Sequence, residues 1–165
     1  MINIRLATTD DLDKLEDIFL AAKQTMRRDG NMHQWTEADY PICYTRKDLN
    51  NKSCYVVEDD GEITATFVLQ LGEEITYKII DNGAWLNSRP YATIHRIASN
   101  GHTKDIFGKV LQFDKQFDVD TRIDTSKDNK RMTHLIQKHN FIYCGTIYIR
   151  DGSPRDAYQK LKEGL

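Results

Sequence analysis

The chain has 165 residues, of which 39% are hydrophobic and 29% are charged, and its formal net charge is −2. This length predicts one folded domain over residues 1–165, and the charge argues against nonspecific nucleic-acid binding, which needs a basic face. No apolar run approaches the roughly 20 residues of a membrane span, and the first residues lack a signal core, so we expect a cytoplasmic protein.

The N-terminal third predicts a strand, a long helix and a loosely ordered segment. Residues 2–6 have the pattern of a strand, and Thr8 or Thr9 then caps a helix whose first turn holds aspartates. The buried stripe of that helix consists of Leu12, Leu15, Phe19, Ala22 and Met26. Gly30 ends the helix, and residues 31–51 are expected to be irregular or weakly helical.

The middle of the chain predicts a hairpin and a further strand. Residues 54–58 and 62–71 flank an Asp-Asp-Gly turn, which favours a hairpin. Residues 90–98 predict the further strand, and a Ser-Asn-Gly sequence ends it. One face of that strand is expected to carry Tyr91, Thr93, His95 and Ile97.

Two more helices follow, separated by a strand. The first has an apolar stripe of Ile106, Val110, Phe113 and Phe117. The strand at residues 121–124 breaks at a polar corner, residues 125–128, so the next helix is predicted to begin near Asp128 or Asn129. The core-facing stripe of this last helix consists of Met132, Leu135, Ile136 and His139.

The end of the chain predicts strands again. Asn140 ends the last helix because Asn tolerates the left-handed conformation, and residues 141–148 predict a buried strand. After a turn, residues 157–161 form a possible edge strand. The whole order predicts an α+β or α/β fold with one mixed sheet, and the polar corner at residues 125–128 is a site candidate because such corners present side chains to ligands.

The cysteines are Cys43, Cys54 and Cys144, which are odd in number and unclustered. This pattern favours buried free thiols over a disulfide framework or a structural zinc site. We therefore expect no bound metal.

Several residues also carry a resemblance to a known family. The segment from Thr93 to Ala98 is similar to the central strand of the GNAT N-acetyltransferase family, and the succession of elements resembles the GNAT fold over nearly the whole chain. The spacing of Asn129, Phe141 and Gly145 around the last helix is similar to the family's second conserved motif. The resemblance implies a single domain with a central mixed, mostly antiparallel sheet flanked by helices. It also implies transfer of an acetyl group from acetyl-CoA (coenzyme A) to a primary amine of a small molecule or peptide.

The resemblance implies a coenzyme site that departs from the family pattern. The residues that match the family's coenzyme loop are His102, Thr103, Lys104, Asp105, Ile106 and Phe107. Asp105 and Phe107 occupy the positions usually held by small residues, chiefly glycine, and Gly108 comes one place late. The resemblance also implies that Ile97 and Ala98 offer backbone groups to the pantetheine arm and that Asn129 contacts the coenzyme. The alternatives are a simple helix start, helped by Thr103 or Asp105, and a helix cap at Asn129.

The catalytic groups are less clearly marked. Ile136 occupies the position of the family's proton-donating tyrosine, so Tyr143 and Cys144 are the substitutes by proximity in sequence. His95 is a candidate base, since histidine titrates near neutral pH; the alternative is a hydrogen-bonded core histidine.

The acceptor is expected to meet the irregular segments. The aromatic residues there that the fold would place beside an acceptor groove are Trp35, Tyr40, Tyr77 and Trp85. Aromatic rings suit an apolar or cationic amine, and the alternative is packing. The adjacent Glu73 and Glu74 would attract a cationic acceptor or form a solvated turn.

Two hypotheses compete with the enzyme. The first is a degenerate GNAT-fold binding or regulatory module without catalysis, favoured by the altered loop and the absent tyrosine. The second is an interaction protein that forms a homodimer through its terminal strands. Binding of acetyl-CoA separates the enzyme from both.

Overall fold

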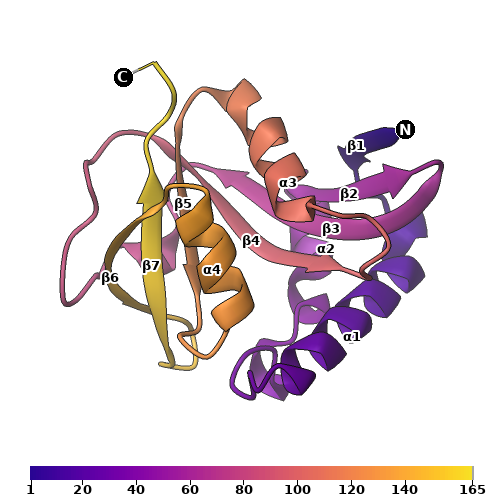
Figure 1. The fold of residues 1–165 in the computed structure, drawn as a ribbon, viewed down its shortest axis with the longest axis horizontal. Helices are drawn as coiled ribbons and strands as arrows, with labels where there is room; N and C mark the ends of the chain where they lie inside the picture. The colour runs from indigo at the N-terminus through magenta and orange to yellow at the C-terminus, as the bar shows by residue number, and fades with distance from the viewer. Residues whose placement is uncertain (165) are drawn as a thin grey trace.

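The computed structural model describes residues 1–164, and its strands form one mixed seven-stranded sheet in the order β1-β2-β3-β4-β5-β7-β6 (Figure 1). The strands are β1 (Ile2–Leu6), β2 (Cys54–Asp59), β3 (Glu62–Leu71), β4 (Tyr91–Ser99), β5 (Asp120–Thr125), β6 (Ile142–Tyr148) and β7 (Pro154–Lys160). Among the strands of residues 1–164, only β4 and β5 pair in parallel, and the other neighbouring strands pair antiparallel. The expected mixed, mostly antiparallel sheet is confirmed.

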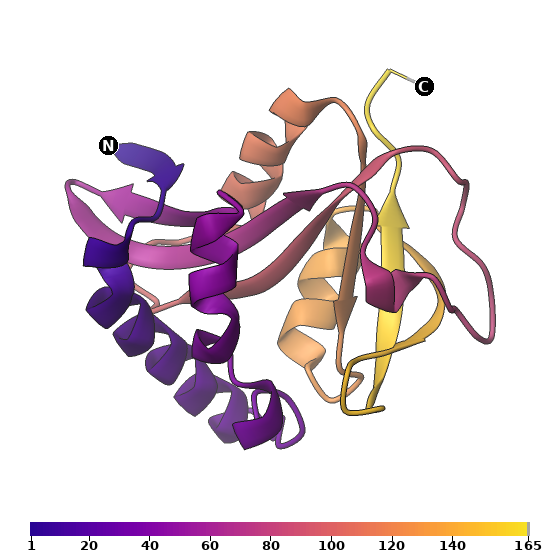
Figure 2. The same ribbon diagram turned by 180° about the vertical axis from the view of Figure 1, so that it is seen from behind.

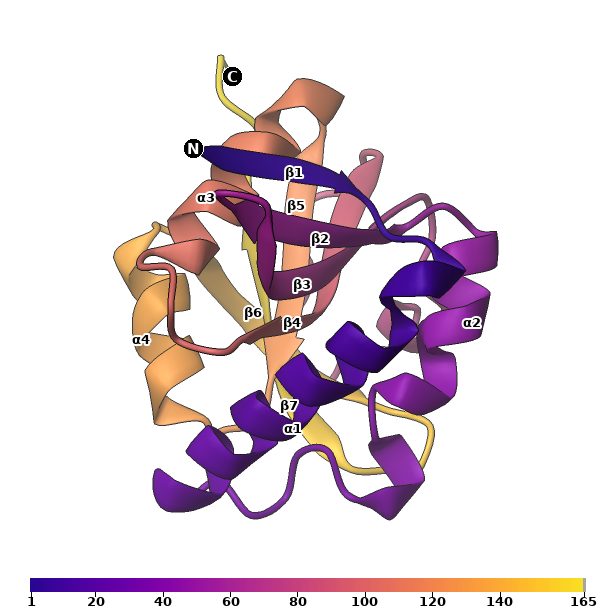
Figure 3. The ribbon, with the colours of Figure 1, turned by 90° about the vertical axis from the view of Figure 1, so that its right-hand side faces the viewer.

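Helices cover both faces of the sheet. They are α1 (Leu12–Arg28), α2 (Ile42–Asn50), α3 (Ile106–Asp114) and α4 (Lys130–Lys138). Figure 2 shows α1 and α2 on one face, and Figure 3 shows α3 and α4 on the opposite face. Phe67, Val110 and Ile136 belong to the core under α3 and α4, whereas Leu15 and Phe19 belong to the core under α1. The helix α2 is a regular nine-residue helix in the segment expected to be weakly helical.

A β-bulge interrupts β4 in the middle of the sheet. Val68 of β3 lies opposite His95, but Thr66 lies opposite Ala98, so β4 contains one more residue than β3 over this stretch. Arg96 sits at the bulge with a φ of 50°. Because the extra residue reverses the alternation, Ile97 packs into the core under α3 and α4. The expectation that His95 and Ile97 share one face was therefore wrong.

The strands β4 and β5 separate soon after they meet. They pair only through residues 91–93 and 120–122, and β4 continues to Ser99 without a partner strand on that side within the described chain (Figure 1). The backbone N–H and C=O groups on this edge of β4 are therefore free of the sheet ladder. This divergence positions the candidate site.

The two C-terminal strands occupy the reverse of their expected places. The strand β7 lies between β5 and β6, so it is interior, and β6 is the edge strand. The sequence pattern suggested a buried strand for β6, but Ile142 and Tyr143 are each 51% exposed. The reason is topological: the chain passes from α4 to the outer position first and then returns to fill the gap beside β5. Cys43 was likewise expected to be buried and is exposed.

No helix within residues 1–164 combines the length and apolar character needed to cross a membrane.

Candidate functional site

Two cavities meet where β4 and β5 diverge. One, the polar cavity, measures about 520 Å³ and lies toward α2 and the loop after β3. The other, the apolar cavity, measures about 550 Å³ and lies between α1, α3 and α4. The residues that line both are Met26, Ile97, Asn129 and Met132. A ligand in either cavity therefore approaches the same short stretch of β4.

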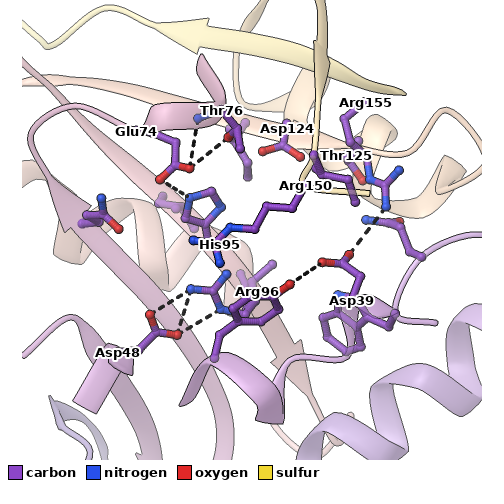
Figure 4. A pocket seen from close by; sticks show the side chains of 18 of the residues that line it. Asp39, Asp48, Glu74, Thr76, His95, Arg96, Asp124, Thr125, Arg150 and Arg155 are labelled. Carbon is purple, nitrogen blue, oxygen red and sulfur yellow. Dashed lines mark hydrogen bonds and ion pairs between the residues drawn. The ribbon is translucent and has the colours of Figure 1, made fainter. Parts of the chain in front are cut away.

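The polar cavity contains a carboxylate and imidazole pair. Glu74 follows β3 and His95 lies on β4, with 3.3 Å between Glu74 Oε2 and His95 Nε2 (Figure 4). The Thr76 hydroxyl also donates to Glu74, at 2.9 Å, and the Glu74 N–H donates to the Tyr91 hydroxyl oxygen at 2.8 Å. Burial alone would raise the pKa of Glu74, but the bonds from His95 and Thr76 together outweigh it and lower that pKa to about 2. Glu74 is thus a fixed anion that orients the ring.

Two further ion pairs line the polar cavity. Arg96 binds Asp48 of α2 through two nitrogens, with N to O distances of 2.8–3.0 Å, and Arg155 of β7 lies 3.7 Å from Asp39 (Figure 4). Burial raises the pKa of both Asp48 and Asp39, against the opposing effect of the arginines. The Asp48 contact also holds Arg96 in its left-handed conformation at the bulge.

Asp124, at the end of β5, is held by a hydrogen bond from Tyr77. The Tyr77 hydroxyl donates to its carboxylate at 2.6 Å, and burial raises the pKa of Tyr77 well above its usual value. The Tyr77 ring is fully enclosed by neighbours that include His95, 6.1 Å away between ring centroids. Tyr77 therefore positions Asp124 without lining the cavity itself.

The apolar cavity is bounded by the far half of β4 and by helix ends. Its apolar lining residues are Ala22, Met26, Ile97, Ala98, Ile106, Phe107, Met132 and Leu135. Three contacts connect the end of α1 and the loop after it to the start of α4: Asp29 with Arg131 at 2.8 Å, His33 with Asp128 at 2.6 Å, and Gln34 with Asn129 at 2.9 Å. The start of α4 is thereby fixed beside β4.

The loop before α3 shows that Asp105 caps the helix. Asp105 has a φ of 54°, and its carboxylate accepts the Gly108 N–H at 3.3 Å, so the Ile106 and Phe107 N–H groups remain for other acceptors. Thr103 is buried, and its hydroxyl forms a hydrogen bond with the Thr64 hydroxyl, with 2.7 Å between the two oxygens. Of the expected coenzyme residues, those that line the apolar cavity are Ile97, Ala98, Thr103, Asp105, Ile106, Phe107 and Asn129, and those that do not are His102, Lys104 and Gly108.

Asn129 performs two structural tasks at the meeting point. Its side-chain oxygen accepts the Met132 N–H at 3.1 Å, which caps α4, and its amide nitrogen donates to Gln34. The helix start predicted near this residue is confirmed. Because Asn129 also lines both cavities, the cap and a ligand contact are compatible.

The other expected site residues divide between the cavity and elsewhere. His95 and Trp35 line the polar cavity, whereas Tyr40, Tyr77 and Trp85 do not. Tyr143 and Cys144 lie on β6, separated from the cleft by β7 and β5, and line neither cavity. The Cys144 thiol contacts the Ile142 carbonyl at 3.3 Å, and burial raises its pKa. Topology thus removes these two as proton donors, and Ile136 is fully buried in the core.

The sequence did not identify several charged residues of the polar cavity, namely Asp39, Asp48, Arg96, Asp124, Arg150 and Arg155. Only Arg96 and Asp124 had a local signal, because they stand on or beside candidate segments. The others come from the segment expected to be irregular, from the turn before β7 and from the start of β7, and only the fold brings them together. Within residues 1–164, no three His, Cys, Asp or Glu side chains form a group that could hold a metal ion.

Comparisons with known proteins show which solved structures share this fold. A scan against protein-family models and a search of curated proteins found no match. Among solved structures, a GNAT-family acetyltransferase from Listeria monocytogenes has a TM-score of 0.72 at 14% identity, covering 97% of this chain and 94% of that one. The loading GNATL domain of CurA from Lyngbya majuscula has a TM-score of 0.67 at 8% identity, covering 98% of each chain. These two likenesses show the fold.

A third structure is similar in sequence as well. It is a GNAT-family acetyltransferase from Streptococcus agalactiae, with a TM-score of 0.87 and 30% identity over 98% of this chain and 96% of that one. With this identity over nearly its full length, the chain belongs to the GNAT family.

Proposed function

We propose that the chain is an N-acyltransferase that transfers an acetyl group from acetyl-CoA to a primary amine. Membership of the GNAT family supports acyl transfer in general. The observation that carries the proposal is the divergence of β4 and β5, which leaves a free backbone edge where the polar and apolar cavities meet. Two substrates that enter from opposite sides would meet there.

The residues of the apolar cavity fit a coenzyme. Ile97 and Ala98, on the free edge of β4, would pair with the amides of the pantetheine arm, and the Ile106 and Phe107 N–H groups at the start of α3 would face its phosphates. Asp105 opposes those phosphates with its own charge. When bound, the coenzyme supplies a thioester carbonyl that an amine can attack.

His95 is the residue that we assign as the base. With Nε2–H donated to Glu74, Nδ1 is the ring nitrogen that carries a lone pair, so it can accept a proton from the acceptor amine. Glu74 fixes this tautomer and stabilises the imidazolium that forms, because it remains ionised. Free N–H groups on β4 are donors for an oxygen that gains negative charge during the attack.

The test is release of free thiol from acetyl-CoA in the presence of a panel of amines. We expect amine-dependent thiol release, and we expect His95→Gln to lower kcat by about 100-fold or more while leaving the KM for acetyl-CoA unchanged. His134→Gln, on the exposed face of α4, is the matched control and should retain full activity. Equal activity of His95→Gln and the control would remove His95 from the chemistry.

A second candidate function is a GNAT-fold module that binds without catalysis. The observation that favours it is the Asp105 carboxylate at the start of α3, together with Ile136 in the place of an acid. This module would release no thiol from acetyl-CoA with any amine.

A further inference from the structure

The charges that line the polar cavity are mostly neutralised within the protein. The acids with an ion-pair partner are Asp39 with Arg155, Asp48 with Arg96, and Glu73 with Lys78, whereas Glu74 is engaged by the hydrogen bond with His95. Within residues 1–164, the other lining charges, which have no ion-pair partner, are Lys47, Arg150 and Asp124. The cavity therefore offers a ligand two cations, Lys47 and Arg150, and one anion, Asp124.

Arg150 is placed to bind an anion. It stands in the turn between β6 and β7, and Figure 4 shows its side chain extending into the cavity. Its guanidinium carbon lies 5.6 Å from the centre of the Tyr44 ring, which Arg96 also contacts at 5.1 Å. This contact with the ring does not use the N–H groups of the guanidinium, so they remain available for a two-point contact with a carboxylate.

Asp124 is placed to bind a cation. Its partner within the described chain is the Tyr77 hydroxyl, a neutral donor, so its negative charge is not compensated. The neighbouring Thr125 and Asn129 also line this side, where the polar cavity reaches the free edge of β4. An ammonium group that enters the polar cavity beside β4 can contact Asp124, and His95 lines the same cavity.

We propose that the acceptor is an amine that also carries a carboxylate, as free amino acids do, and that Arg150 binds the carboxylate while Asp124 receives the amine. This inference rests on the proposed function. A singly charged carboxylate suits the cavity better than a phosphate dianion, because Asp124, a lining acid without an ion-pair partner among residues 1–164, would repel a second negative charge. Arg150 is thus a specificity-determining residue.

The experiment compares each common amino acid with its amide, which keeps the amine and loses the carboxylate charge. Thiol release from acetyl-CoA gives kcat/KM, and calorimetric titration with the N-acetylated amino acids gives binding without any reaction. We expect the wild type to prefer acids over amides. We expect Arg150→Gln to weaken the acids by about tenfold or more and to leave the amides unchanged.

Arg46→Gln, an exposed arginine of α2 outside the cavity, is the control and should behave as wild type. Equal use of acids and amides by the wild type, or equal losses for both in Arg150→Gln, would overturn the inference. Selective binding of the acids without thiol release would sustain the carboxylate site and contradict the proposed function. A preference for phosphorylated amines over amino acids would also overturn the inference that the acceptor carries a carboxylate.

Discussion

Three side chains at the site stand in backbone conformations that ordinary residues rarely adopt. Trp35, Arg96 and Asp105 have φ values of 55°, 50° and 54°. Such residues persist when their surroundings hold them, and here Asp48 binds Arg96 while Asp105 is held by its own cap bond. Trp35 packs edge-on against Phe19. Each lies on a cavity wall, so the strained positions coincide with the proposed site.

Asp105 gives the first prediction. Asp105→Asn and Asp105→Gly both remove a negative charge from the start of α3, and both residue types tolerate a positive φ. We expect each variant to bind acetyl-CoA more tightly, by about tenfold or less, with most of the gain at low salt. Calorimetric titration at two salt concentrations measures this.

Stability should differ little between the two Asp105 variants. Asparagine keeps a cap oxygen, and glycine loses it at a cost of roughly a few tenths of a kcal/mol. If both variants bind the coenzyme as the parent does at each salt concentration, then the phosphates do not lie near this carboxylate.

Glu74 gives a prediction about pH. Its native pKa of about 2 lies below the roughly 4.3 of a free glutamate, so ionised Glu74 stabilises the fold above that value. The contribution, about 3 kcal/mol, should decline as the pH falls from about 4.3 toward 2. We therefore expect Glu74→Gln to be less stable than wild type at pH 6, with a difference that shrinks in acid.

Urea unfolding of both proteins between pH 7 and pH 3 is the measurement. Glu73→Gln is the control, because Glu73 is exposed and its pair with Lys78 lies at the surface. A Glu74→Gln deficit that stays constant with pH would mean that the native carboxylate is not favoured as described.

At the scale of elements, local signals predicted most of the boundaries. The Asp-Asp-Gly turn does take positive φ values, 49° at Asp60 and 86° at Gly61, and Asn140 ends α4 with a φ of 67°. These features depend on neighbours in sequence. The bulge at Arg96 and the interior place of β7 depend on which strands pair, which no local pattern encodes.

The segment between η3 (Ile75–Tyr77) and β4 is fixed against β6 by close backbone approach. Asp81 and Thr146 exchange N–H to O=C bonds of 2.9 and 2.8 Å. A Cβ on Gly83 would overlap the Cys144 carbonyl, so we expect Gly83→Ala to lower the free energy of unfolding by about 2 kcal/mol or more. Gly152→Ala, which also has positive φ but open space around it, should cost about 1 kcal/mol. If urea unfolding gives the same loss of unfolding free energy for Gly83→Ala and Gly152→Ala, then the backbone at Gly83 does not lie tightly against β6.

Asn129 caps α4 and also lines both cavities. Asn129→Asp keeps the oxygen that caps α4 and loses the N–H that binds Gln34, whereas Asn129→Ala loses both. We expect only the alanine variant to lose about 1 kcal/mol of stability, and both variants to bind acetyl-CoA more weakly. Thermal melts and titration of the same samples measure the two effects. Unchanged binding in both variants would leave Asn129 as a helix cap.

Across the whole molecule, the site combines segments that differ in how readily the sequence marks them. His95, Ile97 and Asn129 were identified because they stand in or beside regular elements with recognisable spacing. Asp48 comes from α2, in a segment expected to be irregular, and Arg150 comes from a turn, so only the fold brings them to one cavity. Tyr143 and Cys144 were chosen by nearness in sequence, which the insertion of β7 makes misleading.

The central claim is that the diverging β4 edge and the apolar cavity bind acetyl-CoA. Calorimetric titration of the wild-type chain with acetyl-CoA tests it most directly. We predict saturable binding with a dissociation constant near the micromolar range, accompanied by about 2.7 kcal/mol of stabilisation at 100 times that constant. No heat of binding and no rise in Tm at millimolar acetyl-CoA would contradict the account.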